Sequence, residues 1–299
     1  MNVEYIKSLD QRAQEVNASS DRIYQDAFER AEMLKTQTLT ELDALIEAAP
    51  NAGEKKELFS LEDNAERLIA STLKKISEQL GSNPGGWHED AETKKHYYIK
   101  FYKNPDQART EFVANEIYRR LRIKAAQSEL FEMDKRLAIA SAAIPDAQPA
   151  YWQEQLEDQD VRAGFVADAY LANWDVFGLN WDNIVRGKDG MYRIDNGGTL
   201  TFRAQGDAKI FSSDTIPELD TMRDPHYASG RIFNTLSEDD VRNQAVELAE
   251  RLQENDIENI VRRSGMNQER ADATARALIG RRRFLMEKFQ ILETAQNER

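Results

Sequence analysis

Three side chains that can bind a metal ion or accept a proton lie within the stretch 172–200, ANWDVFGLNWDNIVRGKDGMYRIDNGGTL. They are Asp175, Asn183 and Asp195. Magnesium favours oxygen ligands, and it commonly takes one or two protein carboxylates together with substrate phosphates. Phosphoryl transfer needs an acid beside the attacking hydroxyl, an amide on the metal and a carboxylate between metal and phosphate. The residue types and their order therefore predict a magnesium-dependent site for phosphoryl transfer from ATP.

A loop and a hairpin must position these three residues. The helical pattern of residues 151–173 ends just before Asp175, and two short strands, 183–186 and 191–195, flank a turn at residues 187–190. Such a hairpin carries Asp195 back alongside Asn183. Taken singly, each residue is more often a helix cap or a turn residue. The ordered set after an amphipathic helix favours the functional interpretation.

The order Asp, Asn, strand, turn, strand, Asp-Asn-Gly resembles the protein-kinase-like superfamily. It is most similar to the atypical branch, which includes type II phosphatidylinositol 4-kinases, HipA-type toxin kinases and minimal kinase-like bacterial effectors. The segments NWDVFGLNWDNIV and RIDNGGTLTFRAQG also resemble kinase-like domains of bacterial and phage-associated proteins. The resemblance implies that Asp175 is the catalytic-loop Asp and that Asn183 and Asp195 bind the metal.

The spacing departs from that family pattern. The Asp and Asn are usually about five positions apart in such kinases, whereas Asp175 and Asn183 are eight apart. Asn180 has the usual offset, but no apolar strand follows it directly. We therefore prefer Asn183 as the metal ligand and keep Asn180 as the alternative.

A small lobe that binds the nucleotide should precede this site. The resemblance implies that Lys100, in the strand 97–101, contacts the ATP phosphates, and that Gly85 and Gly86 form a phosphate-covering turn. A lone Gly-Gly pair is more often an ordinary hairpin, and a strand Lys is usually only solvated. Tyr98 lies two residues before Lys100, on the same strand face, where familiar kinases place a small residue over adenine.

After that strand, Asn104-Pro105 opens a helix with Pro105 at its first position. In this superfamily such a helix donates a glutamate to the strand lysine. Glu111 and Glu116 both lie at edges of the apolar arc, so amphipathicity does not choose between them. The family spacing favours Glu111.

The composition excludes several other classes of function. The 299 residues carry a net charge of −13, which opposes binding to a nucleic acid backbone. There is no cysteine, and His88, His96 and His226 lack zinc-site spacing. We see no apolar run long enough to span a membrane and no Sec-type signal peptide, so we expect cytoplasmic synthesis, with specialised export or virion association left open.

The pattern along the chain divides it into three parts. A helical extension covers residues 1–80, with helices within 4–49 and at 61–80. A small lobe at 81–144 holds a hairpin formed by a short strand near Trp87 and a strand at 96–102, the helix from Pro105, and an edge strand and hinge at 128–144. A helical lobe covers 145–299, with helices at 238–255, 256–264 and 268–294.

Two further segments carry charge or hydroxyl groups. The polar loop between Asp195 and Pro225 has the position of an activation or substrate loop. A phosphate group added to Ser212 or Thr215 could form an ion pair with Arg203. Most loop hydroxyls have no such role. The run 281–283, three arginines on a C-terminal helix, is expected to be a salt-bridged surface and less readily a contact for acidic partners.

The sequence thus predicts an α+β, two-lobed, protein-kinase-like fold with an N-terminal helical extension. The function expected is Mg-ATP-dependent phosphoryl transfer, and the resemblance favours a Ser/Thr protein kinase of atypical type with a protein substrate. Lipid and small-molecule acceptors stay open. The alternatives are a pseudokinase-like scaffold and an AMP-transferring enzyme on the same fold. The N-terminal helices are expected to brace the small lobe or bind a partner.

Overall fold

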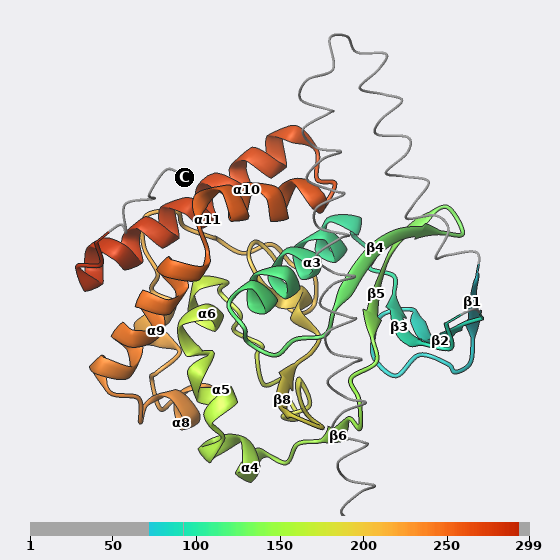
Figure 1. Cartoon of the computed structure of the whole chain (residues 1–299), viewed down its shortest axis with the longest axis horizontal. Coiled ribbons are helices and arrows are strands. Elements are labelled where there is room, and N and C mark those ends of the chain that lie inside the picture. The colour runs from blue at the N-terminus through green and yellow to red at the C-terminus, as the bar shows by residue number, and fades with distance from the viewer. Residues whose placement is uncertain (1–71, 92, 293–299) are drawn as a thin grey trace, which may run out of the picture. The chain divides into compact units, whose positions relative to one another are not determined.

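The computed structural model describes residues 72–91 and 93–292, which all belong to one compact unit. A five-stranded antiparallel sheet forms its smaller lobe (Figure 1). In spatial order the strands are β1 (Leu73–Lys75), β2 (Gly85–Asp90), β3 (His96–Lys100), β5 (Arg136–Ala142) and β4 (Ser128–Met133). The helices predicted within 4–49, and their expected partner, lie outside the described residues. So does the first part of the helix predicted at 61–80.

The prediction is wrong for the rest of that helix. Leu73–Lys75 forms strand β1, which pairs with β2 so that Lys75 lies opposite His88, and no helix covers residues 76–80. Leu73, Ile76 and Leu80 have helical spacing, but the ladder with β2 satisfies the backbone of β1 instead. The sheet therefore begins before Gly81. The edge strand predicted within 128–144 is β4, and β5 from the same stretch lies inside the sheet.

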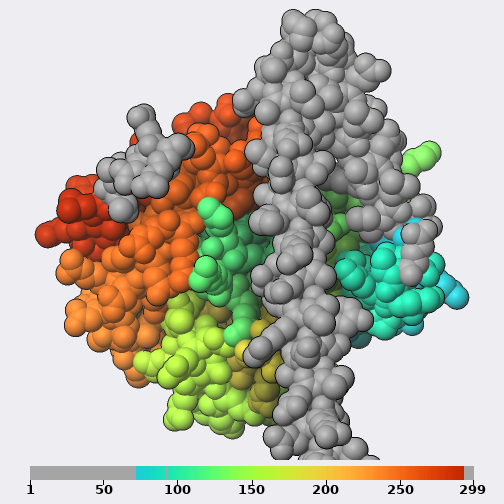
Figure 2. All heavy atoms as spheres, viewed as in Figure 1, coloured from blue at the N-terminus to red at the C-terminus, as the bar shows by residue number. Residues whose placement is uncertain are grey.

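Helix α3 (Pro105–Arg120) packs between this sheet and the helical lobe (Figure 1). It begins at Pro105, as predicted. The Asn104 side chain accepts a hydrogen bond from the backbone N–H of Asp106 at 3.0 Å, and Pro105 has no backbone N–H that would need an acceptor. Ile117 and Tyr118 are fully buried in the main core. In the space-filling view α3 reaches the surface beside the orange C-terminal helices (Figure 2).

The larger lobe is helical and carries a second, three-stranded sheet in the order β6 (Gln148–Pro149), β7 (Ile184–Gly187) and β8 (Gly190–Arg193). Its helices are α4 (Trp152–Glu157), α5 (Gln159–Ala163), α6 (Phe165–Tyr170), α7 (Glu218–Thr221), α8 (Gly230–Phe233), α9 (Glu238–Arg251), α10 (Glu254–Arg263) and α11 (Gln268–Phe289). The prediction of a small strand-containing lobe and a helical lobe is confirmed. No helix in the part of the chain that the structure describes has the length and apolarity to cross a membrane.

The stretch 151–173 forms three short helices rather than one. Asp158 ends α4 in an extended conformation, and its side chain caps α5 by accepting from the N–H of Val161 at 3.0 Å. Gly164 separates α5 from α6. Local capping therefore divides a segment whose apolar pattern is continuous.

The arginine run at 281–283 is not a surface, which corrects our expectation. Arg281 and Arg282 are buried, and Arg283 alone of the three is exposed, paired with Glu254 at 2.7 Å. The guanidinium of Arg281 donates to the carbonyls of Ala169 and Tyr170 and to the carboxylate of Glu218. It also donates to the carbonyls of Ser212 and Thr215, so it joins α6 to the loop that follows Asp195.

Candidate active site

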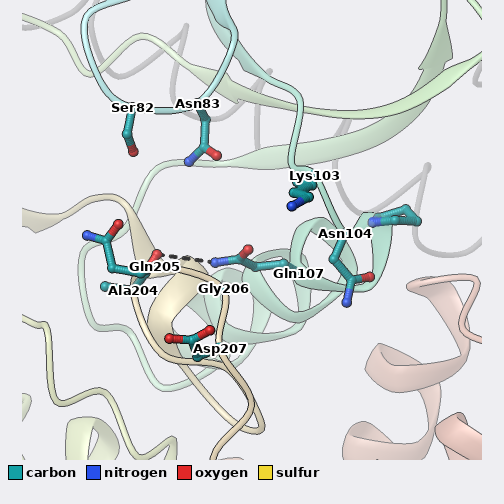
Figure 3. Close-up of a pocket in the computed structure, with 10 residues that line it drawn as sticks. Ser82, Asn83, Lys103, Asn104, Gln107, Ala204, Gln205, Gly206 and Asp207 are labelled. Atoms are coloured by element: carbon teal, nitrogen blue, oxygen red, sulfur yellow. Dashed lines mark hydrogen bonds between the residues drawn. The ribbon is translucent and has the colours of Figure 1, made fainter.

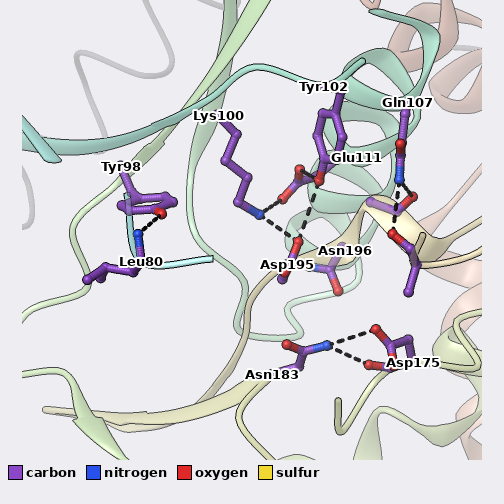
Figure 4. A network of polar contacts seen from close by, with 12 residues as sticks. Leu80, Tyr98, Lys100, Tyr102, Gln107, Glu111, Asp175, Asn183, Asp195 and Asn196 are labelled. Carbon is purple, nitrogen blue, oxygen red and sulfur yellow. Dashed lines mark hydrogen bonds and ion pairs between the residues drawn. The ribbon is translucent and has the colours of Figure 1, made fainter. Parts of the chain in front are cut away.

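The ammonium group of Lys100 lies between two carboxylates that come from distant parts of the chain (Figure 4). Its Nζ is 2.9 Å from Oε1 of Glu111 on α3 and 2.8 Å from Oδ1 of Asp195, which follows β8. The hydroxyl of Tyr102 donates to Oε2 of Glu111 at 2.6 Å. One strand, one helix and one turn thus meet at a single cation.

The same geometry distinguishes the two glutamates that the sequence left as alternatives. Glu111 is 1 % exposed and faces Lys100. Glu116 instead pairs with Arg119 at 3.0 Å and with Arg263 at 2.9 Å. The helix turns by about 100° per residue, so five positions place the two glutamates on different sides of α3.

Electrostatics keeps this cluster charged. Burial by itself would lower the pKa of Lys100, but the charges of Glu111 and Asp195 outweigh it and hold that pKa above its usual value. The Lys100 charge in turn lowers the pKa of Asp195. Asp195 is therefore an anion at neutral pH, and half of its side chain is exposed to solvent.

Asp175 and Asn183 form the second half of the site. The Asn183 amide donates to the backbone carbonyl of Asp175 at 2.8 Å and to its Oδ2 at 3.3 Å. The hairpin returns as predicted, because the N–H of Ile194 binds the carbonyl of Asn183 at 2.9 Å. In Figure 4 Asp195 lies between Lys100 and Asn183. Asn180, the alternative ligand, is exposed.

The pKa of Asp175 is raised, first by burial and then by the negative charge of Asp195, while the Asn183 hydrogen bond opposes the rise. A carboxyl group whose pKa is raised by burial and by a neighbouring carboxylate is typical of sites that bind a cation or transfer a proton. A bound cation would relieve the repulsion. The electrostatics thus fits Asp175 as an acceptor of a proton and Asp195 as a metal ligand.

The donor set fits magnesium. Asn183 uses its amide N–H groups on Asp175, which leaves its oxygen for a ligand, and Oδ2 of Asp195 receives none of the hydrogen bonds within residues 72–91 and 93–292. Those ranges contain no group of three or more His, Cys, Asp or Glu side chains able to hold a metal. An Asn/Asp pair completed by phosphates is the smaller ligand set that Mg²⁺ commonly takes.

Gly85 and Gly86 do not form the turn that we predicted for them. They begin strand β2, where Gly85 pairs with Lys100 and Gly86 with Ile99. A Cβ atom on Gly85 would lie 1.9 Å from the Ile99 carbonyl oxygen, so the close approach of β2 to β3 requires glycine. The connection to β1 is formed by residues 76–84 instead. Tyr98 holds that connection, since its hydroxyl accepts from the N–H of Leu80 at 2.9 Å.

A buried column of polar side chains, which the sequence did not reveal, leads from the Asp195 turn into both lobes. The Asn196 amide donates to Asn115 on α3 at 2.8 Å and accepts from Asn173 at 3.1 Å. Asn173 donates to the Tyr118 hydroxyl, which donates to Asp168, and Asp168 pairs with Arg193 at 2.7 Å. Asn196 follows Asp195 directly, and its Asp-Asn-Gly context was the one available signal.

A cavity of about 480 Å³ adjoins the site (Figure 3). Its walls come from three places, namely the β1–β2 connection, the start of α3 and the turn after Asp195; they include Ser82, Asn83, Lys103, Gln107, Gln205 and Asp207. Gln107 is buried, and its amide donates to the carbonyls of Gly197 and Ala204 at 3.2 and 3.4 Å. The cavity therefore opens beside the same turn that carries Asp195, and its lining is mostly polar.

No protein-family model and no curated protein matches the chain. Among solved structures, the proinflammatory kinase CtkA of Helicobacter pylori has a TM-score of 0.51 at 16 % identity, over 74 % of this chain and 97 % of CtkA.

The described residues have a protein-kinase-like fold. HipA of Shewanella oneidensis, from a complex with HipB and operator DNA, is also similar, with a TM-score of 0.43 at 10 % identity over 74 % of this chain and 68 % of HipA. Choline kinase LicA of Streptococcus pneumoniae has a TM-score of 0.28 at 15 % identity, over 78 % of this chain and all of LicA (100 %). The predicted protein-kinase-like fold is confirmed by the similarity to CtkA.

Proposed function

We propose that this protein transfers the γ-phosphoryl group of ATP, with Mg²⁺, to a hydroxyl acceptor, and that the acceptor is a Ser or Thr side chain of a protein. The observation that carries the proposal is the contact of Lys100 with both Glu111 and Asp195, beside the Asp175–Asn183 pair. These contacts join residues as far apart as 100 and 195 into one cluster within a kinase-like fold.

Each residue has a role that follows from its surroundings. Lys100, fixed by Glu111, presents its ammonium to the ATP phosphates, and Tyr102 holds the other oxygen of Glu111 in place. Asp195 and the Asn183 amide oxygen would hold Mg²⁺, which neutralises phosphate charge when bound. Asp175, whose pKa is raised, accepts a hydrogen bond or the proton of the attacking hydroxyl.

Phosphoryl transfer depends mainly on positioning and on charge stabilisation, because the transition state is loose and spreads its charge over the phosphoryl oxygens. The cluster supplies both. Lys100 provides a fixed cation that needs no reorganisation during the reaction. The Asp175–Asn183 hydrogen bond restrains the Asp175 carboxylate.

The experiment is a labelling assay with two forms of radioactive ATP. Native protein, Asp195→Ala and Lys100→Ala are incubated with Mg²⁺ and either γ-labelled or α-labelled ATP, together with a mixed protein acceptor. We expect label from γ-labelled ATP on Ser or Thr with native protein and a loss of at least about 10³-fold in both variants. Label from α-labelled ATP would indicate AMP transfer, and equal labelling by all three proteins would reject the proposed site.

A further inference from the structure

Lys209 contacts both halves of the candidate site, although nothing in the sequence marked it. Its Nζ donates to the carbonyl of Ala172 at 2.5 Å and to the carbonyl of Gly198 at 2.7 Å. Ala172 precedes Asp175 by three residues, and Gly198 follows Asp195 by three residues. One ammonium group therefore joins the segment that presents Asp175 to the turn that presents Asp195.

The base of the Lys209 side chain is itself fixed. The N–H of Lys209 donates to the carbonyl of Thr201 at 2.8 Å, and the neighbouring Ala208 forms a β-bridge with Phe202. The N–H of Leu200 donates to the carbonyl of Leu171 at 2.8 Å, which holds the same two segments together one residue before Ala172 and two residues after Gly198. Lys209 is thus the charged member of a short, ordered junction.

The junction reaches Asp175 by packing. A Cβ atom on Gly198 would lie 3.5 Å from the Asp175 Cβ and 3.1 Å from the backbone nitrogen of Ala204. Gly198 is therefore close to the proposed base on one side and to the wall of the cavity on another. Any shift of the Gly198 carbonyl, which Lys209 holds, displaces the surroundings of Asp175.

The charge of Lys209 is poorly compensated for a partly buried position. Both of its side-chain hydrogen bonds go to carbonyl oxygens rather than to a carboxylate. Burial lowers its pKa to about 7; the charges of Glu218 on α7 and Asp175 oppose this fall, and those of Arg203 and of Arg281 on α11 add to it. In return, the Lys209 charge counters the rise in the pKa of Asp175. A partly buried amine without an anion is costly, which argues for a role beyond packing.

We propose that Lys209 is a positioning residue that fixes Asp175 relative to Asp195, through the carbonyls of Ala172 and Gly198, and supplies positive charge beside the segment that carries Asp175. This inference rests on the proposed phosphoryl transfer, since the separation of Asp175 and Asp195 matters only if both act on the same reactants. Negative charge from a bound nucleotide favours the ammonium form of Lys209 and so strengthens both carbonyl contacts.

The first test compares the rate of ATP turnover and the KM for ATP in native protein, Lys209→Met, Lys209→Arg and Lys135→Met. Lys135 is an exposed lysine in the turn between β4 and β5 and serves as the matched control. We expect Lys209→Met to lower kcat about 100-fold, because small misplacements at a reacting centre have effects of that size. KM for ATP should change less than about threefold, because the contacts of Lys100 with the phosphates are kept.

Rescue by arginine separates this role from a merely structural one. Lys209→Arg keeps a cation that can donate to the carbonyls of Ala172 and Gly198, whereas Lys209→Met loses both contacts. We therefore expect the kcat of Lys209→Arg to stay within about tenfold of native protein, with the two variants compared at equal folded fraction. A kcat of Lys209→Met within about threefold of native protein, or a kcat of Lys209→Arg no higher than that of Lys209→Met, contradicts the inference.

A second measurement needs no variant and covers the case in which Lys209→Met does not fold. Acetic anhydride modifies neutral amines, so the labelling of Lys209, read by peptide mass spectrometry against Lys135, reports its charge. We expect Mg·ATP to slow labelling of Lys209 at pH 7 by about fivefold, which corresponds to a pKa rise of about one unit. Labelling that Mg·ATP leaves unchanged contradicts the inference, whereas native protein without any ATP turnover contradicts the proposed function itself and removes this role with it.

Discussion

Two regions of the molecule each hold a cation against carboxylate, and they differ in how completely they are closed. Arg193 and Asp168 are 1 % and 0 % exposed, and Tyr118, Val161 and Asp160 complete the bonding of this pair. Lys100 and Glu111 are nearly as buried, but the third member of their cluster, Asp195, has half of its side chain exposed. Every nitrogen of the Arg193 guanidinium and both Asp168 oxygens in the closed pair have a hydrogen-bond partner, whereas Asp195 in the open cluster keeps an exposed carboxylate for a ligand.

The difference teaches where chemistry can occur in this fold. A buried ion pair whose polar atoms are all satisfied stabilises one arrangement of helices, and the loss of either partner leaves a charge without compensation. A cluster that is buried on one side and open on the other keeps its side chains charged and leaves some of their hydrogen-bonding positions free for a ligand. We therefore expect substitutions in the closed region to alter stability and those in the open region to alter activity.

The largest effect is expected for Asp195→Asn. The change keeps the shape of the side chain but removes the charge that would bind Mg²⁺ and that contacts Lys100. Phosphoryl transfer from ATP should fall at least about 10³-fold. Because Asp195 is half exposed, the free energy of unfolding in urea should change by less than about 1 kcal/mol. A variant that is inactive because it is unfolded would contradict the assignment of Asp195 to an open site.

The next largest effect is expected for Arg193→Met in the closed region. It leaves the Asp168 carboxylate buried without its cation, and it should lower the free energy of unfolding by about 3–5 kcal/mol. Urea denaturation followed by circular dichroism measures this loss. Arg283→Met, at an exposed ion pair with Glu254, is the control and should cost less than about 1 kcal/mol. Equal stability of the two variants would show that closure does not separate the regions.

Asn196→Leu tests the column that links the two regions. The substitution removes the hydrogen bond that the buried Asn115 amide oxygen accepts and one of the two that the Asn173 amide donates, so unfolding should become easier by about 1–3 kcal/mol. Because the same residue follows Asp195, phosphoryl transfer should also fall, though less than in Asp195→Asn. A double-mutant cycle with Asn115→Leu measures the coupling, and purely additive effects on stability would mean that the column does not act as a unit.

The smallest effect concerns pH and Asp175. Its pKa is raised in the folded protein, so the protonated form is favoured by folding, and this contribution to stability is lost as pH rises through that pKa. Asp175→Asn should therefore be more stable than native protein at neutral pH, by less than about 1 kcal/mol, and the difference should vanish below about pH 3.9. Thermal unfolding between pH 3 and pH 8 provides the measurement. A variant less stable than native protein at pH 7 would contradict the repulsion between Asp175 and Asp195.

Local signals in the sequence predicted the elements whose cause is local. Asn104-Pro105 marks the start of α3 because the cap and the proline act within a few residues, and the turn at 187–190 identifies the hairpin that returns Asp195 toward Asn183. The family resemblance supplied the pairing of Lys100 with Glu111, whereas the contact of Lys100 with Asp195 was not predicted.

The features that the sequence did not reveal depend on contacts between distant segments. Strand β1 has helical spacing and is a strand because it pairs with β2. Lys209 binds main-chain carbonyls, which are present at every position and leave no mark in the sequence. Arg281 belongs to a charged run that is typical of a surface. It is nevertheless buried, and its guanidinium donates to five backbone and side-chain acceptors from three segments.

The most direct measurement of the central claim is calorimetric titration of a non-hydrolysable ATP analogue into native protein, Asp195→Ala and Glu116→Gln, with and without Mg²⁺. The account predicts binding that requires Mg²⁺ in native protein and in Glu116→Gln, and its loss in Asp195→Ala. Unchanged binding by Asp195→Ala, or no binding by native protein in the presence of Mg²⁺, would contradict it.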